Sequence, residues 1–129
     1  YRLKDLVKDF LNKKKQPIED LGCFSLDAVD YPDYAKLLSD KLKNDLNSQG
    51  ILFCGTGIGI SMAANRYSHI RAALCTTAEM ASKSRKHNNA NVLALGGRII
   101  TDSLAMDIVN EFLNTDFEAG RHSIRVNKI

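Results

Sequence analysis

Two kinds of hydrophobic pattern alternate along the chain. Apolar residues recur every three or four positions in some segments, which is typical of helices packed on one face. Other segments are short, continuous apolar runs, as expected for strands buried on both faces. Helices are expected at about residues 3–15, 32–46, 60–66, 78–86 and 103–113. Strands are expected at about residues 18–24, 51–54, 70–75 and 91–95.

Strands that alternate with helices and lack in/out alternation predict an α/β fold. The expected architecture is a Rossmann-like, three-layer αβα arrangement, in which helices cover both faces of an open parallel sheet. Neither an internal repeat nor a linker interrupts residues 1–129, so we expect one domain.

Charge and cysteine content exclude several classes of protein. The 129 residues carry 18 basic and 15 acidic side chains, for a net charge of +3, which is too balanced for nucleic-acid or membrane-surface binding. No apolar run is long enough to cross a bilayer. Three cysteines without C-x-x-C spacing predict no disulfide framework and a cytoplasmic location. The three histidines lack zinc-ligand spacing, so no metal and no other cofactor is expected.

The stretch Cys54-Gly55-Thr56-Gly57-Ile58-Gly59 joins a predicted strand to a predicted helix. Backbone N–H groups at such a turn can hold a phosphate or a developing oxyanion, although a plain tight turn is the alternative. The glycine spacing fits neither the dinucleotide fingerprint nor the G-K-[ST] phosphate loop. Cys54 is either a buried strand cysteine or, beside a helix N-terminus, a thiolate that acts as nucleophile or base.

Other candidate side chains follow the predicted strands and helices. We expect the segments Asp30-Tyr31, 54–59, His87-Asn88 and Arg98 to converge at the carboxyl edge of the sheet, where open α/β folds bind ligands. His87 is either an exposed loop histidine or a general acid/base. Arg121 and Arg125, four residues apart, either share a helix face that grips a phosphate or belong to a solvated tail.

These motifs, taken together, resemble the type B ribose-5-phosphate isomerases and related sugar-phosphate isomerases. The resemblance covers essentially the whole chain in the family's order. Its matching stretches are Asp30-Tyr31-Pro32-Asp33-Tyr34-Ala35, Cys54 to Ser61, Ala63-Ala64-Asn65, Ile70 to Leu74, His87 to Val92, Gly97-Arg98 and Phe117 to His122.

The resemblance implies metal-independent interconversion of ribose 5-phosphate and ribulose 5-phosphate through an enediolate. Cys54 is then the base that moves a proton between C1 and C2, and His87 opens the sugar ring. Thr56 and the backbone of the Gly55–Gly59 loop, including Gly57 and Ile58, stabilise the enediolate. Sugar contacts are expected from Asp30, Tyr31 and Asn88, and phosphate contacts from Arg98, Arg121 and Arg125.

The resemblance also implies a homodimer, or a tetramer, whose sites are shared between subunits. The family begins with a strand that ends in Asp-His-x-Gly, just before the stretch matching Tyr1-Arg2-Leu3-Lys4. We therefore expect the printed sequence to lack that central strand. Alternatives are an isomerase of a six-carbon sugar phosphate (galactose 6-phosphate or allose 6-phosphate) and a non-catalytic sugar-phosphate or nucleotide binding module. A nucleic-acid role for residues 121–128 is the most remote alternative.

Overall fold

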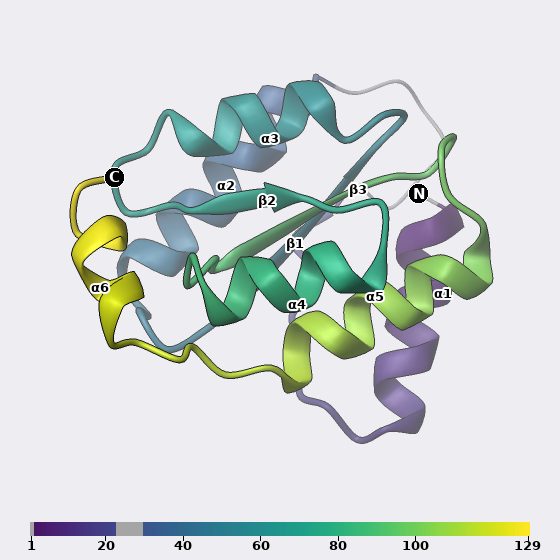
Figure 1. The fold of residues 1–129 in the computed structure, drawn as a ribbon. Coiled ribbons are helices and arrows are strands. Elements are labelled where there is room, and N and C mark those ends of the chain that lie inside the picture. Colours follow the sequence, from purple (N-terminus) through teal and green to yellow (C-terminus); the bar gives the residue numbers. More distant parts are fainter. Residues whose placement is uncertain (1, 23–29) are drawn as a thin grey trace.

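The computed structural model describes residues 2–22 and 30–129, and these residues form six helices and three strands (Figure 1). In chain order they are α1 (Arg2–Lys13), α2 (Tyr31–Lys43), β1 (Gly50–Cys54), α3 (Ile58–Asn65), β2 (Ala72–Leu74), α4 (Ala78–Lys86), β3 (Val92–Gly96), α5 (Asp102–Asn114) and α6 (Arg121–Val126). None of these helices has the length and apolar character needed to cross a bilayer.

The three strands form one parallel sheet in the order β1-β3-β2. Across β1 and β3, Gly50 lies opposite Val92 and Cys54 lies opposite Gly96. The side chains from Val92 to Leu95 are 0% exposed, which explains the continuous apolar run in the sequence. The predicted open parallel sheet is confirmed.

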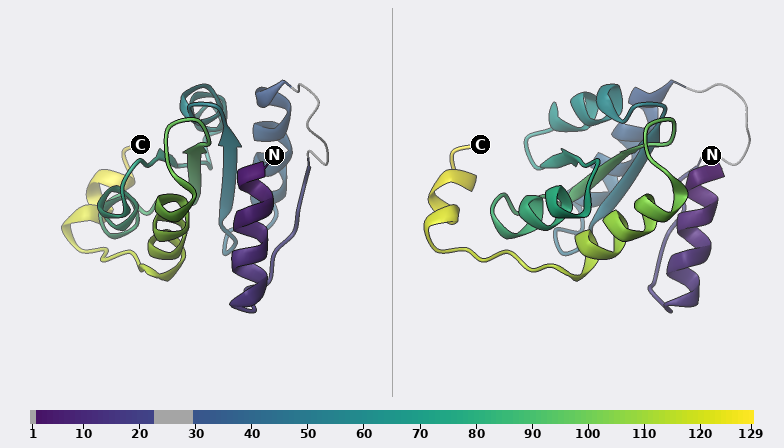
Figure 2. Two further views of the ribbon diagram at one scale, coloured as in Figure 1. Left: turned by 90° about the vertical axis from the view of Figure 1, so that its right-hand side faces the viewer. Right: turned by 45° about the vertical axis from the view of Figure 1, so that its right-hand side comes forward.

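Helices cover both faces of this sheet, and alternate side chains of β3 contact the two layers (Figure 2). Leu93 and Leu95 pack against α1, α4 and α5, whereas Val92 and Ala94 pack against α2 and α3. Alternation arises because successive residues of a strand point to opposite faces. Full burial of each Val or Leu contributes about 1.5–3 kcal/mol. The predicted three-layer αβα arrangement is confirmed.

Helix α2 ends three residues earlier than its sequence pattern predicts. It stops at Lys43, and Leu46, expected on the buried side, is 78% exposed. The Asp45 side chain accepts hydrogen bonds from the Asn47 N–H (3.3 Å) and the Ser48 hydroxyl (2.5 Å). These local bonds offer the backbone a turn in place of a further helical turn.

The strand predicted at residues 18–24 is wrong for the part that the structure describes. Residues 18–22 form no strand, and residues 23–29 lie outside the described part of the chain. A strand forms only where it can pair with a neighbouring backbone. Among the described strands β1 pairs with β3 alone, so residues 18–22 do not pair with its other edge. The segment is held instead by ion pairs from Asp20 to Lys4 (2.9 Å) and Lys8 (3.1 Å), and from Glu19 to Lys41 (3.0 Å).

A groove of about 1110 Å³ lies along the edge of β1 that pairs with no described strand. Its walls come from α1, residues 16–22 and α2, and it reaches Cys54 and Arg98 at one end. The ion pairs of Asp20 and Glu19 therefore hold one wall of this groove in place.

Asp20 contributes to stability at neutral pH through these contacts. Its partial burial alone would raise its pKa, but hydrogen bonds from Lys4, the Gly22 N–H and Lys8 lower it from 3.8 to about 2. A depressed folded pKa means that the stabilisation is complete above pH 3.8 and is lost as the pH falls toward 2.

We expect Asp20→Asn to lower the free energy of unfolding at neutral pH by about 1–2 kcal/mol, given partial solvent screening of the pair with Lys8. Urea unfolding from neutral pH down to the folded pKa of about 2 measures this difference, which should vanish at the acid end. Asp9→Asn, on the exposed face of α1, is the control. A difference that persists in acid would contradict the electrostatic origin.

Candidate active site

The loop after β1 is built on glycines and held to the loop after β3. Gly57 has a φ of +81°, a left-handed conformation that glycine adopts without a steric penalty. The Gly97 N–H donates to the Cys54 carbonyl and the Arg98 N–H to the Gly55 carbonyl, both at 2.9 Å. The two loops are therefore fixed relative to each other at the carboxyl edge of the sheet.

Cys54 lies half-buried at the end of β1, and its sulfur faces a backbone donor. The Gly57 N–H donates a hydrogen bond to Cys54 Sγ at 3.1 Å, and the Ile58 N–H donates to Thr56 Oγ1 at 3.2 Å. Both N–H groups belong to the start of α3, where the helix dipole favours negative charge. The sulfur thus lies beside a backbone donor at the start of α3.

Cys75 has a different environment. It is 1% exposed, and burial raises its pKa to about 11, so its thiol stays neutral. Cys75 is therefore a residue of the core. Cys23 lies outside the described residues.

Tyr31 and Arg98 extend the site around the glycine loop. A β carbon at Gly59 would lie 2.7 Å from Tyr31 Cζ, and one at Gly55 would lie 3.3 Å from Arg98 Cδ, Nε and Nη1. Asp30 immediately precedes α2 beside Tyr31, without a capping hydrogen bond from its side chain. We call the group formed by Tyr31, Cys54, Thr56, Arg98 and the loop between them the thiol site.

His87 and Asn88 do not join the thiol site within one chain, so the expected convergence of four segments is wrong. His87 caps the carboxyl end of α4, a helix that starts after the carboxyl end of β2 and ends just before the amino end of β3. A helix that connects parallel strands must run back along the sheet, so its last residues lie at the amino edge. Five strand residues span about 16 Å, which separates the two edges.

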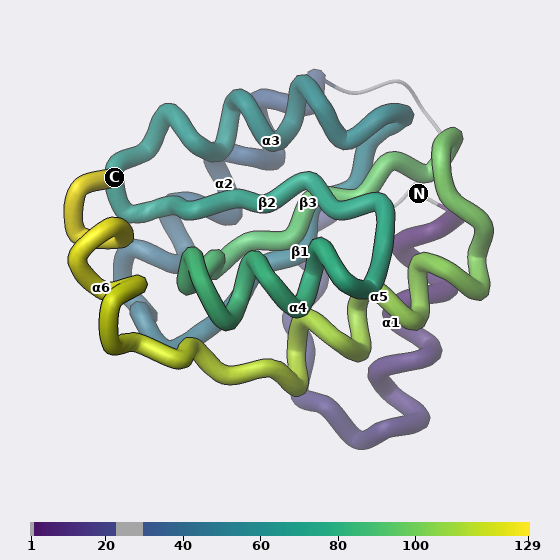
Figure 3. Tube along the Cα trace, in the orientation of Figure 1, coloured from purple at the N-terminus to yellow at the C-terminus, as the bar shows by residue number. Residues whose placement is uncertain are grey.

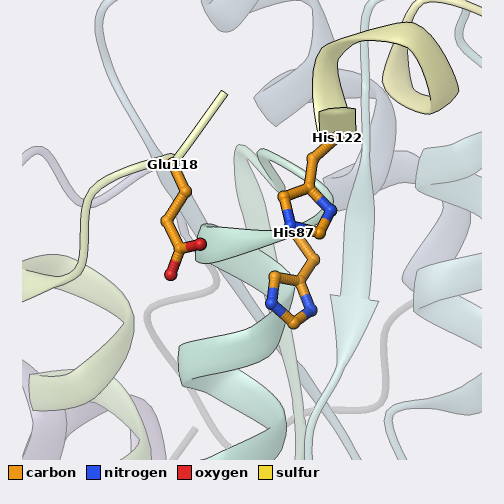
Figure 4. Close-up of side chains that lie close together, drawn as sticks. All are labelled: His87, Glu118 and His122. Atoms are coloured by element: carbon orange, nitrogen blue, oxygen red, sulfur yellow. The ribbon is translucent and has the colours of Figure 1, made fainter. Parts of the chain in front are cut away.

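His87 meets the C-terminal part of the chain instead. The rings of His87 and His122 stack with centroids 4.3 Å apart and planes 15° from parallel (Figure 4). His122 belongs to α6, as do Arg121 and Arg125, and Figure 3 shows α6 beside the end of α4. We call the group formed by His87, Asn88, Arg121, His122 and Arg125 the histidine site. No periodic or spacing signal in the sequence indicates the contact with His122, which joins positions 35 residues apart.

Glu118 brings a carboxylate close to both rings, and the donor atoms of His87, Glu118 and His122 lie within 4.8 Å of one another. Imidazole and carboxylate are zinc ligands in proteins. Because the rings are nearly parallel, their in-plane lone pairs run side by side and do not meet at one point. The observed arrangement is one of ring stacking, and a metal ion would need at least one ring to turn.

Comparisons with known proteins agree with this fold. The family model described as Ribose/Galactose Isomerase matches residues 1–129. A probable ribose-5-phosphate isomerase B of Mycoplasma pneumoniae is 48% identical over 128 residues, covering 98% of this chain and 84% of the relative. A putative sugar phosphate isomerase of Rickettsia bellii is 45% identical over 129 residues, covering 100% of this chain and 90% of the relative.

Solved structures show the same similarity. The ribose 5-phosphate isomerase of Thermotoga maritima has a TM-score of 0.95 at 50% identity, covering 98% of this chain and 88% of that one. Ribose-5-phosphate isomerase B of Mycoplasma genitalium, solved with bound ribulose-5-phosphate, has a TM-score of 0.95 at 44% identity, covering 98% and 85%. This chain belongs to the ribose/galactose isomerase family, and it is an aldose–ketose isomerase.

Gly96 provides a test of the packing that shapes the thiol site. A β carbon at Gly96 would lie 2.5 Å from the Thr56 carbonyl carbon and 2.9 Å from its Cα, whereas one at Gly97 would meet nothing closer than 3.7 Å. We expect Gly96→Ala to lower the free energy of unfolding by about 1–3 kcal/mol and to displace Thr56. Gly97→Ala is the matched control. Chemical denaturation measures the difference, and equal stabilities of the two variants would contradict it.

His122 should make stability depend on pH. Its side chain is 8% exposed, and burial, followed by the charges of His87 and Arg121, lowers its pKa below 6.5. The unfolded chain then binds more protons than the folded chain as the pH falls below 6.5, so stability is complete above that pH and declines beneath it.

His122→Phe keeps an aromatic ring but has no group that binds a proton. We expect its melting temperature to change less with pH than that of the native chain, from about pH 7 to values below 6.5. Thermal melts across this range measure both slopes. Equal slopes would show that His122 does not titrate differently on folding.

Proposed function

We propose that the chain interconverts ribose 5-phosphate and ribulose 5-phosphate, with each active site assembled from the thiol site of one copy and the histidine site of another. The observation that carries this proposal is the separation of Cys54 and His87 at opposite edges of the sheet. Proton transfers to neighbouring atoms of one sugar require groups within about 3 Å of those atoms. A separation of about 16 Å excludes this within one chain.

In the first step, His87 opens the furanose ring. As a general base it takes the proton of the O1 hydroxyl, and the C1–O4 bond breaks as the C1 aldehyde forms. As a general acid it gives the proton to the ring oxygen O4. His87 caps α4 and stacks on His122, so its ring is oriented before the substrate arrives.

In the second step, Cys54 moves a proton between two carbons. Its thiolate removes the C2 proton, and the charge moves onto O1 of the resulting enediolate. The hydroxyl proton passes between O2 and O1, and return of the carbon-bound proton to C1 gives the ketose. The hydrogen bond from the Gly57 N–H to Cys54 Sγ supports this role, because it stabilises the anionic base.

The developing enediolate needs donors that are already oriented toward it. Thr56 and the backbone of Gly55 to Gly59 stand beside Cys54 at the start of α3. Removing one such donor typically lowers the rate by about 10²–10³. Tyr31 and Asp30 then contact the sugar from the same copy, and Asn88 contacts it from the other.

The phosphate would be held by arginines of both copies. Arg98 lies against Gly55 in the thiol site, while Arg121 and Arg125 project from α6 in the histidine site. The two α6 arginines are exposed and four residues apart, which suits a shared grip on a phosphate. Binding energy from this remote group fixes the geometry at the reacting carbons.

Mixing two inactive variants tests the shared site. We expect Cys54→Ala and His87→Ala each to lose at least about 10²-fold in the rate of ketose formation from ribose 5-phosphate. Co-refolding them in equal amounts should restore about a quarter of native activity, since half of the dimers then carry one intact site.

The Cys54→Ala,His87→Ala double variant mixed with native protein is the control for subunit exchange. If subunits exchange but the mixture of the two single variants recovers no activity, the shared site is contradicted. Absence of ketose formation by the native chain would contradict the activity itself. Comparison of kcat/KM between ribose 5-phosphate and a six-carbon sugar phosphate decides the substrate.

A further inference from the structure

Two arginines hold the loop that carries His87 and Asn88. Arg85 Nη1 donates to Asn89 Oδ1 (3.0 Å) and to the Ala90 carbonyl (2.5 Å). Arg71 Nε donates to the Asn89 carbonyl at 2.7 Å. The residue directly after the His87-Asn88 pair is therefore bound through both its side chain and its backbone.

Asn89 has a backbone conformation that depends on such support. Its φ is +48°, in the left-handed region that few residues other than glycine adopt, although asparagine is among those that do. Backbone bonds to the preceding helix, from the Asn89 N–H to the Arg85 carbonyl (3.3 Å) and from the Ala90 N–H to the Ser84 carbonyl (2.9 Å), complete the turn. The direction in which the chain leaves α4, directly after His87 and Asn88, follows from this turn.

Arg85 also connects the loop to the segment that leads into α6. Its Nε donates to the Thr115 carbonyl at 3.1 Å, and its guanidinium lies over the Phe112 ring at 5.9 Å. One planar group thus binds residues 89–90, which follow His87, and residue 115, which precedes His122. The two chain segments that carry the stacked histidines are therefore both bound to the same side chain.

Hydrogen bonds, and not ion pairs, are the polar contacts of this cluster. Arg71 and Arg85 are partly buried, and burial lowers the pKa of both. The charge of Asp116 partly offsets this effect at Arg85, but no described carboxylate forms an ion pair with either arginine within 4.0 Å. Placing two cations together in this way opposes folding, so hydrogen bonding to the loop is what the pair provides.

We infer that Arg85, assisted by Arg71, is a positioning residue that sets the place of His87 and Asn88 through Asn89. This inference rests on the proposed function for its effect on the reaction. Only a guanidinium can donate from Nε and Nη1 to three oxygens in fixed directions, so lysine cannot replace it.

Arg85→Lys in the full chain tests the inference. We expect kcat for ribose 5-phosphate to fall about 10-fold or more, because a small displacement of a catalytic group is costly, while KM changes little. Arg66→Lys, at the exposed end of α3, is the matched control and should keep the native kcat. A native kcat in Arg85→Lys would overturn the inference.

A double-mutant cycle distinguishes positioning of His87 from a merely structural role. If Arg85 acts through His87 and Asn88, Arg85→Lys should cause no further loss in a His87→Ala,Asn88→Ala background. A further fall in kcat on adding Arg85→Lys to that background, as large as in the native chain, would overturn the inference. If Arg85→Lys fails to fold, Asn89→Gly replaces it, because glycine tolerates the positive φ but lacks the side-chain oxygen that is one of the three acceptors of Arg85. Asn89→Gly should show the same loss of kcat and the same cycle with His87 and Asn88.

The imidazole NMR signals of His87 and His122 give a readout that does not need activity. Ring stacking makes their chemical shifts sensitive to position, so we expect both to move in Arg85→Lys and neither to move in Arg66→Lys. Unchanged signals in Arg85→Lys would overturn the inference. A native chain that shows no isomerisation would instead contradict the proposed function, with the NMR result still deciding the role of Arg85.

Discussion

Strand β3 lies between β1 and β2 with helices on both faces, and its burial determines where the other elements can lie. A strand that pairs on both edges and packs on both faces must be apolar throughout, as the stretch from Val92 to Leu95 is. Its partners run parallel to it, so each strand must be followed by a helix that returns along the sheet. Side chains that directly follow a strand therefore lie at the carboxyl edge of the sheet, and side chains that directly follow a connecting helix lie at the amino edge.

That directional rule divides the chemistry of the chain. Cys54 and Arg98 follow strands and meet at the carboxyl edge, whereas His87 follows a helix and meets α6 at the amino edge. Each group is assembled by contacts within the chain: the loop bonds at Cys54 and Gly55 on one side, and the stacked histidines on the other. Under the proposed function, both groups act on one sugar, and this sheet allows that only when two copies pair.

Local pattern was sufficient to predict the strands around β3 and most helices. Apolar runs identify β1 and β3 because side chains of both strands pack against helices on both faces, and the spacing of Ile108, Val109 and Phe112 identifies α5. The strand expected at residues 18–24 shows the limit of local pattern, because a strand forms only where a partner backbone is available. The ends of α2 show a second limit, since a polar turn at Asp45 outweighs the apolar Leu46.

The thiol site was also predictable, because its members follow neighbouring strands and the glycine loop has a recognisable composition. The position of His87 was not, since a polar loop is expected at either edge until the direction of α4 is known. His122 and Arg85 carry no signal in their spacing. Their importance arises from contacts with Asn89, Thr115 and His87 that join α4 to the C-terminal segment.

The missing side chain at Gly96 has a consequence for the whole sheet. Thr56 backbone atoms occupy the space where a β carbon would be, and Gly96 is the partner of Cys54 in the strand register. A slip of β3 by one residue would bring Leu95 to that place and would also exchange the two helix-facing sets of side chains. The glycine therefore favours a single alignment of β1 and β3, and that alignment sets the distance between the Cys54 sulfur and the loop after β3.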